Sequence, residues 1–304
     1  MKKIFSGLQK STLQRIANQA QQRHLSRGDA LVAYAMDRLL YRLGRSAQAR
    51  EFFLKGGLLV ANLVSLPHRF TRDIDLLRRH GPPDPEDIRR RFQEVLSVRV
   101  EDGVHFDPSG LRVVQASRDL DGYDGVRVTL RARVGNTDVD IPVDIGFGDA
   151  LVPPAERLAL VTFLEGDPAA EVYAYEAGPV LAEKIETLLS KFPLVEHRLK
   201  DLLDVVILAR QQGFEGPALV ASLRATFERR QTPPELRILD EMHTEFTSRR
   251  WVTRWAVMRR EKAVSIPVEL PEALATFDTF VRPLLQALAG EPPPRSWLPG
   301  GPWS

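Results

Sequence analysis

The first half of this 304-residue chain is patterned as short apolar runs separated by Gly, Pro, Asn and Asp turns. Such runs predict strands, here at residues 51–54, 72–77, 111–115, 126–134 and 139–147. Two helices are predicted among them, a short one over residues 58–66 and a longer one over residues 84–98 that opens on Pro85 and acidic residues. We therefore expect a mixed α/β region that ends near Pro153-Pro154.

Helical spacing dominates the two flanks of this region. Within residues 1–50, one apolar face is predicted from the spacing of Leu31, Tyr34, Ala35, Leu39 and Leu40. Beyond about residue 177 the pattern is helical again, and it continues to about residue 289. Two apolar stripes, each on one face of a predicted helix, lie at its start: Val180, Leu181, Ile185, Leu188 and Leu189, then Leu199, Leu202, Leu203, Val206 and Ile207. The last segment, 291–304, is rich in Pro and Gly, so we expect it to be loose.

Composition narrows the class of protein without identifying it. The chain has no cysteine, which excludes disulfides, thiolate zinc sites and cysteine nucleophiles and fits a reducing cytoplasm. Its histidines show no HxxxH or HExxH spacing, so a zinc site is not expected. The charged first residues lack the apolar core of a signal peptide, and no segment reaches membrane-spanning length. We expect a soluble, cytoplasmic protein with no membrane partner.

Positive charge is concentrated in two clusters, although the net charge is only +2. In residues 1–50 the Lys and Arg side chains face only Asp29 and Asp37, and the cluster at residues 249–262 contains one acid. Such clusters can neutralise nucleic-acid phosphates, although solvated helix faces have the same pattern. Trp251 and Trp255 in the second cluster could stack on bases, but packing between helices is the favoured interpretation. Together the clusters favour, slightly, a polyanionic substrate.

The strongest chemical signal is a glycine pair followed by two aspartates. Gly56 and Gly57 follow Lys55 at the end of an apolar run, and Asp73 and Asp75 lie in the next such run, one residue apart. If that run is a strand, both carboxylates lie on one face. Backbone amides left accessible by glycine, beside two carboxylates, suit a hard cation that carries phosphate oxygens. This arrangement is typical of a site for a nucleoside triphosphate and its magnesium.

A third carboxylate is expected from a neighbouring strand, because two-metal phosphoryl chemistry usually uses one. Asp144 is the best candidate, since it lies in an otherwise apolar run where an ionised carboxylate needs a partner or a metal. Asp138 and Asp140 alternate with it but lie in a more polar segment. The alternative for Asp144 is a strand-end aspartate that backbone amides satisfy.

The helical half adds a lysine and two aspartates. Lys184 lies on the first of its helices, and Asp201 and Asp204 lie three residues apart on the next. A lysine can bind a triphosphate as a point charge, and two aspartates on one helix face could orient that lysine or a substrate hydroxyl. Taken alone, these residues are interpreted as a surface ion-pair network.

Together these motifs resemble the AbiEii family of nucleotidyltransferase toxins, which is sometimes grouped with the MenT toxins. The family pattern is an apolar strand ending in Lys-Gly-Gly, a short helix, and then Arg-x-Ser/Thr-x-Asp-Ile-Asp-Leu. This chain matches that pattern at residues 54–57 and 69–76, and its residues 143–149, 180–184 and 198–204 resemble the later family elements. One departure is Leu58, which stands where members commonly carry Ser or Thr.

The resemblance implies an α/β (α+β) protein with two lobes. Residues 1–155 would form N-terminal helices and a nucleotidyltransferase-fold mixed sheet, and residues 156–290 would form a helical domain. Residues 291–304 would form a tail. It implies magnesium-dependent transfer of a nucleotide from an NTP, with the metal on Asp73, Asp75 and Asp144. The catalytic set would also contain Lys184, Asp201 and Asp204. Nucleotide binding would fall to Lys55, Gly56, Gly57, Arg69, Thr71 and Lys184.

The resemblance also implies a toxin of a bacterial toxin–antitoxin or phage-defence pair. The acceptor would be the 3′ end of tRNA, which would block translation, and a cognate antitoxin is the expected partner. Thr71 is where a modifying antitoxin could add a phosphate and block the metal site by charge. Other classes stay open: a small-molecule or protein nucleotidyltransferase would share the metal site but not the acceptor, and a non-catalytic RNA-binding module would keep only the fold.

Overall fold

The computed structural model of the chain describes residues 7–64, 70–116, 125–261 and 268–304. The chain divides into two compact units. The first unit comprises residues 1–148 and 156–174, and the second unit comprises residues 149–155 and 175–304. The segment 156–174, which the sequence analysis assigned to the helical domain, therefore belongs to the first unit.

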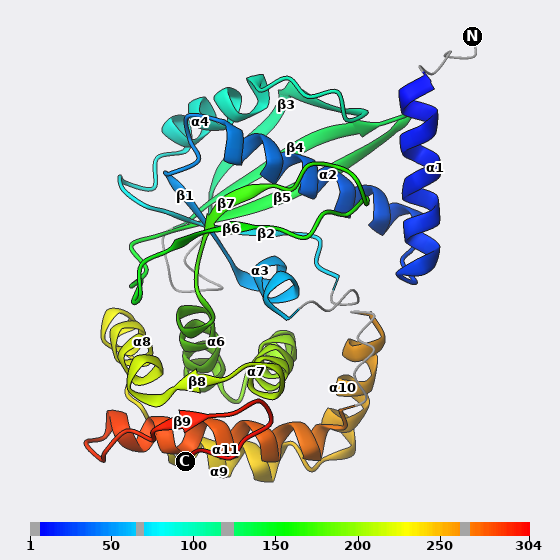
Figure 1. The fold of residues 1–304 in the computed structure, drawn as a ribbon. Helices are drawn as coiled ribbons and strands as arrows, with labels where there is room; N and C mark the ends of the chain where they lie inside the picture. Colours follow the sequence, from blue (N-terminus) through cyan, green and yellow to red (C-terminus); the bar gives the residue numbers. More distant parts are fainter. Residues whose placement is uncertain (1–6, 65–69, 117–124, 262–267) are drawn as a thin grey trace. The chain divides into compact units, whose positions relative to one another are not determined.

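A seven-stranded mixed sheet forms the centre of the first unit, in the order β3-β4-β5-β2-β1-β7-β6 (Figure 1). Parallel pairing joins β2 to β5 and β1 to β7, and the other pairs are antiparallel. The mixed sheet is confirmed, and each predicted strand is present. The strands are β1 (Phe52–Lys55), β2 (Ile74–Arg78), β3 (Val104–Ala116), β4 (Gly125–Val134), β5 (Thr137–Phe147), β6 (Glu156–Ala159) and β7 (Glu171–Ala174).

β6 and β7 do not follow from the pattern of apolar runs in the sequence. Each has only four residues, and β6 is largely exposed, so neither forms an apolar run that the sequence pattern could reveal. β7 pairs with β1 in parallel, and the rings of Phe53 and Tyr173 pack 6.1 Å apart across this pair. The sheet is thus extended beyond β1 by residues far along the chain.

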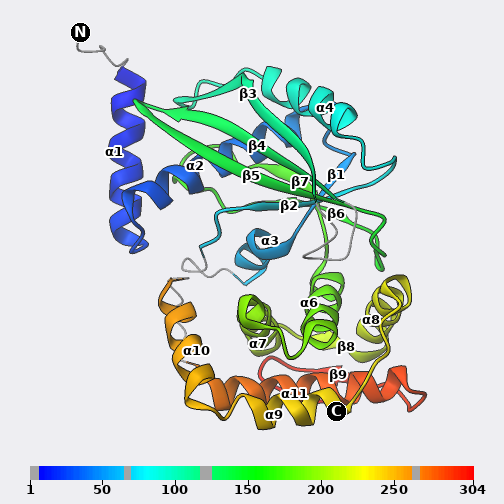
Figure 2. The ribbon, with the colours of Figure 1, turned by 180° about the vertical axis from the view of Figure 1, so that it is seen from behind.

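Helices complete the first unit: α1 (Gly7–Gln22), α2 (Arg27–Arg45), α3 (Gly56–Leu63) and α4 (Pro85–Ser97). The apolar face predicted for α2 is buried. α2 lies across one face of the sheet, whereas the view from behind shows β4 and β5 in front of α2 with no described helix of this unit over them (Figure 2). Arg131 and Arg133 of β4 and Asp138 and Asp140 of β5 are exposed.

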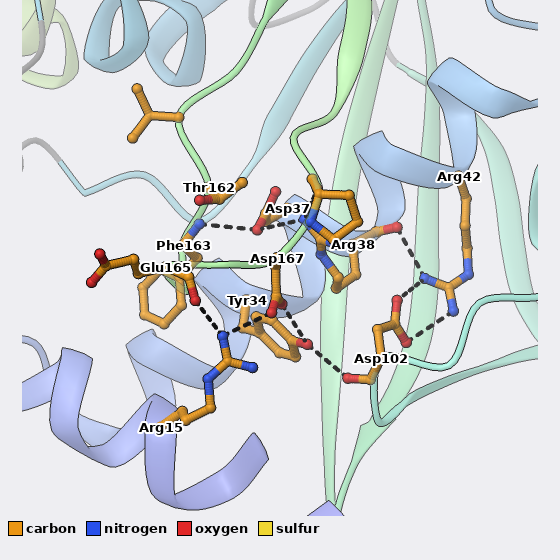
Figure 3. A network of polar contacts seen from close by, with 12 residues as sticks. Arg15, Tyr34, Asp37, Arg38, Arg42, Asp102, Thr162, Phe163, Glu165 and Asp167 are labelled. Atoms are coloured by element: carbon orange, nitrogen blue, oxygen red, sulfur yellow. Dashed lines mark hydrogen bonds and ion pairs between the residues drawn. The ribbon is translucent and has the colours of Figure 1, made fainter. Parts of the chain in front are cut away.

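A buried polar network ties α1 and α2 to the loops before β3 and between β6 and β7 (Figure 3). Arg42 donates to both carboxylate oxygens of Asp102, at 2.6 and 3.1 Å. Arg15 pairs with Asp167 at 2.8 Å, and Arg38 is fully buried. These three arginines belong to the N-terminal basic cluster. The interpretation as a phosphate-binding surface is wrong for Arg38 and Arg42, because both are buried, whereas the Arg15 side chain is 41% exposed.

Methionine in place of Arg42 is expected to lower the free energy of unfolding by about 3–5 kcal/mol, because it leaves the buried Asp102 carboxylate without its partner. Chemical denaturation of the full chain measures this change. The matched control is Arg45→Met, since Arg45 is exposed in the last turn of the same helix. Equal losses in the two variants would show that the buried pair is not a main support of the first unit.

The second unit is helical apart from a two-stranded sheet. The predicted apolar stripes on α6 and α7 are buried, and α6 packs against α7 and α8. No helix among the described residues is long and apolar enough to cross a bilayer. The elements are α6 (Ala177–Lys191), the 3₁₀ helix η1 (Glu196–Arg198), α7 (Leu199–Gln211), β8 (Phe214–Glu215), α8 (Gly216–Arg230), α9 (Arg237–Glu245), α10 (Arg249–Glu261), α11 (Leu270–Leu288) and β9 (Ser296–Trp297).

The C-terminal segment is not loose, which corrects the expectation for residues 291–304. Ser296 and Trp297 pair with β8, and the indole nitrogen of Trp297 donates to the carbonyl of Ala209 at 2.6 Å. Trp303 stacks on Phe280 with ring centroids 5.4 Å apart. The two tryptophans bury enough apolar surface to fix a segment whose Pro and Gly content alone indicates disorder.

The second basic cluster is partly structural as well. Trp251 and Trp255 are buried, so the helix-packing interpretation is confirmed and base stacking is not available to them in this structure. Arg254 pairs with Glu196 at 2.6 Å, and Arg250 pairs with the same carboxylate. Glu196 therefore offsets part of the positive charge of α10. Lys2, Lys3 and Lys262 of the two clusters lie outside the described residues, whereas Lys10 is exposed on α1.

Candidate active site

The three predicted carboxylates, Asp73, Asp75 and Asp144, lie together in the first unit, and we call them the carboxylate triad. Asp75 stands directly opposite Asp144 on the parallel strands β2 and β5, and Asp73 immediately precedes β2. One oxygen of each residue lies within 4.8 Å of the others, and all three residues are half-buried. Carboxylates this close repel one another unless positive charge compensates. An all-oxygen donor set of this kind fits a hard divalent cation.

Gly56 places the first turn of α3 against this triad. Its φ is +67°, in the left-handed region, and a Cβ atom at this position would stand 1.9 Å from Oδ2 of Asp75. Only glycine fits here. Because α3 begins at the glycine pair, two residues earlier than predicted, the N-terminus of this helix lies beside the triad, and a helix N-terminus attracts anions. The first turn of α3 can therefore hold a phosphate next to the carboxylates.

A row of four charged residues crosses the sheet at this level, and we call it the charge row. The strand register sets Lys55 opposite Asp75, Asp75 opposite Asp144, and Asp144 opposite Arg127. Directly opposed residues share a face of the sheet. Arg127 donates to both oxygens of Asp144, from Nε at 2.6 Å and from Nη2 at 2.8 Å. Two carboxylates thus stand between two basic residues. One of these, Arg127, is not among the site residues predicted from the sequence.

Thr71 connects the triad to a cavity. Its hydroxyl donates to a carboxylate oxygen of Asp73, and the residue is itself buried. On its other side lies a cavity of about 290 Å³ between α2, α3 and the loop after β6. Leu58, the residue that departs from the motif, lines this cavity, as does Asp37, whose pKa is raised by burial. Leu58 therefore contributes apolar surface to this cavity, in the first turn of α3.

The second unit contains the other predicted cluster. Nζ of Lys184 lies 2.8 Å from Oδ1 of Asp201 and 2.6 Å from Oδ2 of Asp204. All three residues are buried. The interpretation as a surface ion-pair network is therefore wrong, because burial makes this a compact charge cluster that joins α6 to α7.

The remaining candidate site residues belong to neither cluster. Arg69, assigned to nucleotide binding, lies outside the described residues. Asp138 and Asp140, which the sequence analysis set aside, pair with Arg133 and Arg131 on the open face of the sheet and do not reach the triad. The structure thus brings the predicted residues together in two clusters, one in each unit.

The chain is similar to one protein family and to several solved structures. A family model described as nucleotidyl transferase AbiEii toxin, type IV TA system, matches residues 38–282. MenT4, a nucleotidyltransferase toxin from Mycobacterium tuberculosis H37Rv, has a similar structure, with a TM-score of 0.52 and 18% sequence identity over 91% of this chain and 98% of that chain. JHP933 from Helicobacter pylori gives 0.47 and 14%, over 85% and 93% of the two chains. No curated protein matches the chain. The structural likeness describes the fold alone, whereas the family match includes both residue clusters.

Proposed function

The chain belongs to the AbiEii family of nucleotidyltransferase toxins, and from this premise we propose that it transfers a nucleotide from an NTP, with magnesium, to the 3′ end of tRNA. The observation that carries the proposal is the glycine turn of α3 set against a triad of carboxylates. A divalent cation bound to the triad would supply charge stabilisation for the attacking and leaving oxygens. Capping the tRNA end in this way would block translation.

The residues of the first unit supply the other parts of such a site. Amides at Gly56 and Gly57 would bind phosphate oxygens of the NTP, and Lys55, opposite Asp75, would add positive charge beside them. Thr71 holds Asp73 in place through its hydroxyl. The acceptor hydroxyl would attack the α-phosphorus, so that a new oxygen–phosphorus bond forms while the bond to pyrophosphate breaks. We assign to Asp144 the orientation of that hydroxyl.

We propose that Lys184 neutralises negative charge on the triphosphate, and that Asp201 and Asp204, which hold its ammonium group, orient it. Their support is the family motif together with their burial, which is unusual for charged groups unless they are paired. Family membership supports a cognate antitoxin as partner and a place in toxin–antitoxin or phage-defence systems. Because the proposed acceptor is tRNA, we place the protein in the cytoplasm.

The test of this function is transfer of label from each α-labelled NTP, in turn, to total tRNA in the presence of magnesium. The matched control is the same tRNA after periodate oxidation, which destroys the terminal ribose diol but leaves the rest of the molecule unchanged. Label on intact tRNA and not on oxidised tRNA is the expected result. Label on the protein or on a small molecule would keep the enzyme class and overturn the tRNA acceptor.

A further inference from the structure

Arg127 contacts the carboxylate triad but belongs to none of the sequence motifs described above. It lies on β4, and its guanidinium forms a two-point contact with Asp144, the member of the triad on β5. We infer that Arg127 is a positioning residue: it holds Asp144 turned toward Asp73 and Asp75, so that the three carboxylates are ready for a divalent cation. The inference rests on the proposed function only in requiring that a cation binds to the triad.

The geometry of the contact indicates that Arg127 orients the Asp144 carboxylate and does not block its access to a cation. A planar guanidinium that donates to both oxygens of a carboxylate fixes the plane of that carboxylate as well as its position. Each carboxylate oxygen has a second acceptor site. The oxygens of the triad lie within 4.8 Å of one another while the contact with Arg127 is made. Asp144 can therefore keep its arginine and still offer an oxygen to a cation.

The position of Arg127 in the charge row shows that its positive charge also does not obstruct a cation at the triad. Because the strand order is β4-β5-β2, Arg127 lies on the side of Asp144 that faces away from Asp75. Its positive charge offsets the repulsion within the triad before a cation arrives. Its side chain is 56% exposed, so water weakens its repulsion of a cation at the triad.

The same two strands contain a matched control. Arg133 donates to both oxygens of Asp138, at 2.6 and 3.1 Å, from the same face of β4 to the same face of β5. Its side chain is 49% exposed, close to the value for Arg127. Asp138 is not a member of the triad. Variants at positions 127 and 133 therefore each remove a two-point ion pair between β4 and β5, but only the variant at position 127 removes a partner of the triad.

The test is titration of Mn²⁺ into the full chain without nucleotide, followed by calorimetry and by the electron paramagnetic resonance signal of bound Mn²⁺. Arg127→Gln is expected to weaken Mn²⁺ binding about tenfold, as for other residues that hold a metal ligand in place. Arg127→Lys is expected to give an intermediate affinity, since lysine keeps the charge but not the fork. Arg133→Gln is expected to bind Mn²⁺ like the wild type.

The possible outcomes separate this inference from the proposed function. Unchanged or tighter Mn²⁺ binding by Arg127→Gln, with binding by the wild type and none by Asp75→Asn, would overturn the positioning role and leave the metal site intact. A wild-type chain that binds no Mn²⁺ would overturn both. Equal weakening in Arg127→Gln and Arg133→Gln would assign the effect to the stability of the β4–β5 hairpin and overturn the positioning role. Thermal unfolding of each variant confirms that the chains compared are folded.

Discussion

Asparagine in place of Asp75 is expected to reduce the rate of nucleotide transfer about a thousandfold. Asp75 is the central member of the site: it lies opposite both Lys55 and Asp144 and against Gly56. Asparagine has nearly the same volume, so the contact with Gly56 is kept while the negative charge is lost. Loss of a metal ligand costs several kcal/mol of transition-state stabilisation, and about 4 kcal/mol corresponds to that factor. Initial rates of transfer from an α-labelled NTP measure the effect.

The control for this variant is Asp140→Asn. Asp140 lies on the same face of β5 as Asp144 and pairs with Arg131 outside the triad, so its variant is expected to keep a rate close to that of the wild type. A rate for Asp75→Asn within about tenfold of the wild-type rate would contradict a catalytic triad. Such a result would favour a binding module that has kept the fold without turnover.

Alanine at position 56 is expected to slow transfer strongly and to destabilise the first unit. A Cβ atom would meet the carboxylate of Asp75 at 1.9 Å, so either α3 or Asp75 must move. The left-handed backbone adds about 1–2 kcal/mol of strain for any residue with a side chain. Because the displaced groups are a triad member and the turn for which we propose phosphate binding, transfer is expected to fall at least about a hundredfold. Transfer rate and chemical denaturation are measured together.

Gly81→Ala is the matched control for the Gly56 substitution. Gly81 also has a positive φ, of +100°, but no atom lies within 4 Å of the position where its Cβ would stand. This variant therefore carries backbone strain without a collision, and it is expected to lose stability while keeping transfer. If Gly56→Ala keeps transfer as well as Gly81→Ala does, the close approach of α3 to Asp75 is not required for the reaction.

The triad could be predicted from the sequence because it depends on local rules. Asp73 and Asp75 alternate with the buried Ile74, and the apolar run around Asp144 identified the partner strand. Arg127 was missed, although a signal was present. Val134 and Thr137 close the turn at Gly135-Asn136, and counting seven residues outward from each reaches Arg127 and Asp144. A short hairpin turn fixes its own register, so this pair follows from the sequence.

Other features depend on contacts that local patterns do not contain. Whether an arginine such as Arg42 is solvated or buried depends on Asp102, sixty residues away in the chain. The C-terminal segment was judged from its Pro and Gly content, but Trp297 and Trp303 fix it by packing on Phe280. β6 and β7 are too short to show a period. In each case the deciding partner is distant in sequence, and only tertiary packing brings it close.

The most direct test of the account is anomalous scattering from Mn²⁺ in crystals of the full chain grown with a non-hydrolysable NTP analogue. The account predicts a peak between Asp73, Asp75 and Asp144, about 2.1 Å from their oxygens, with phosphate oxygens of the analogue at the first turn of α3. Nucleotide bound elsewhere, with no peak at the triad, would contradict the proposal that these three carboxylates are the catalytic centre.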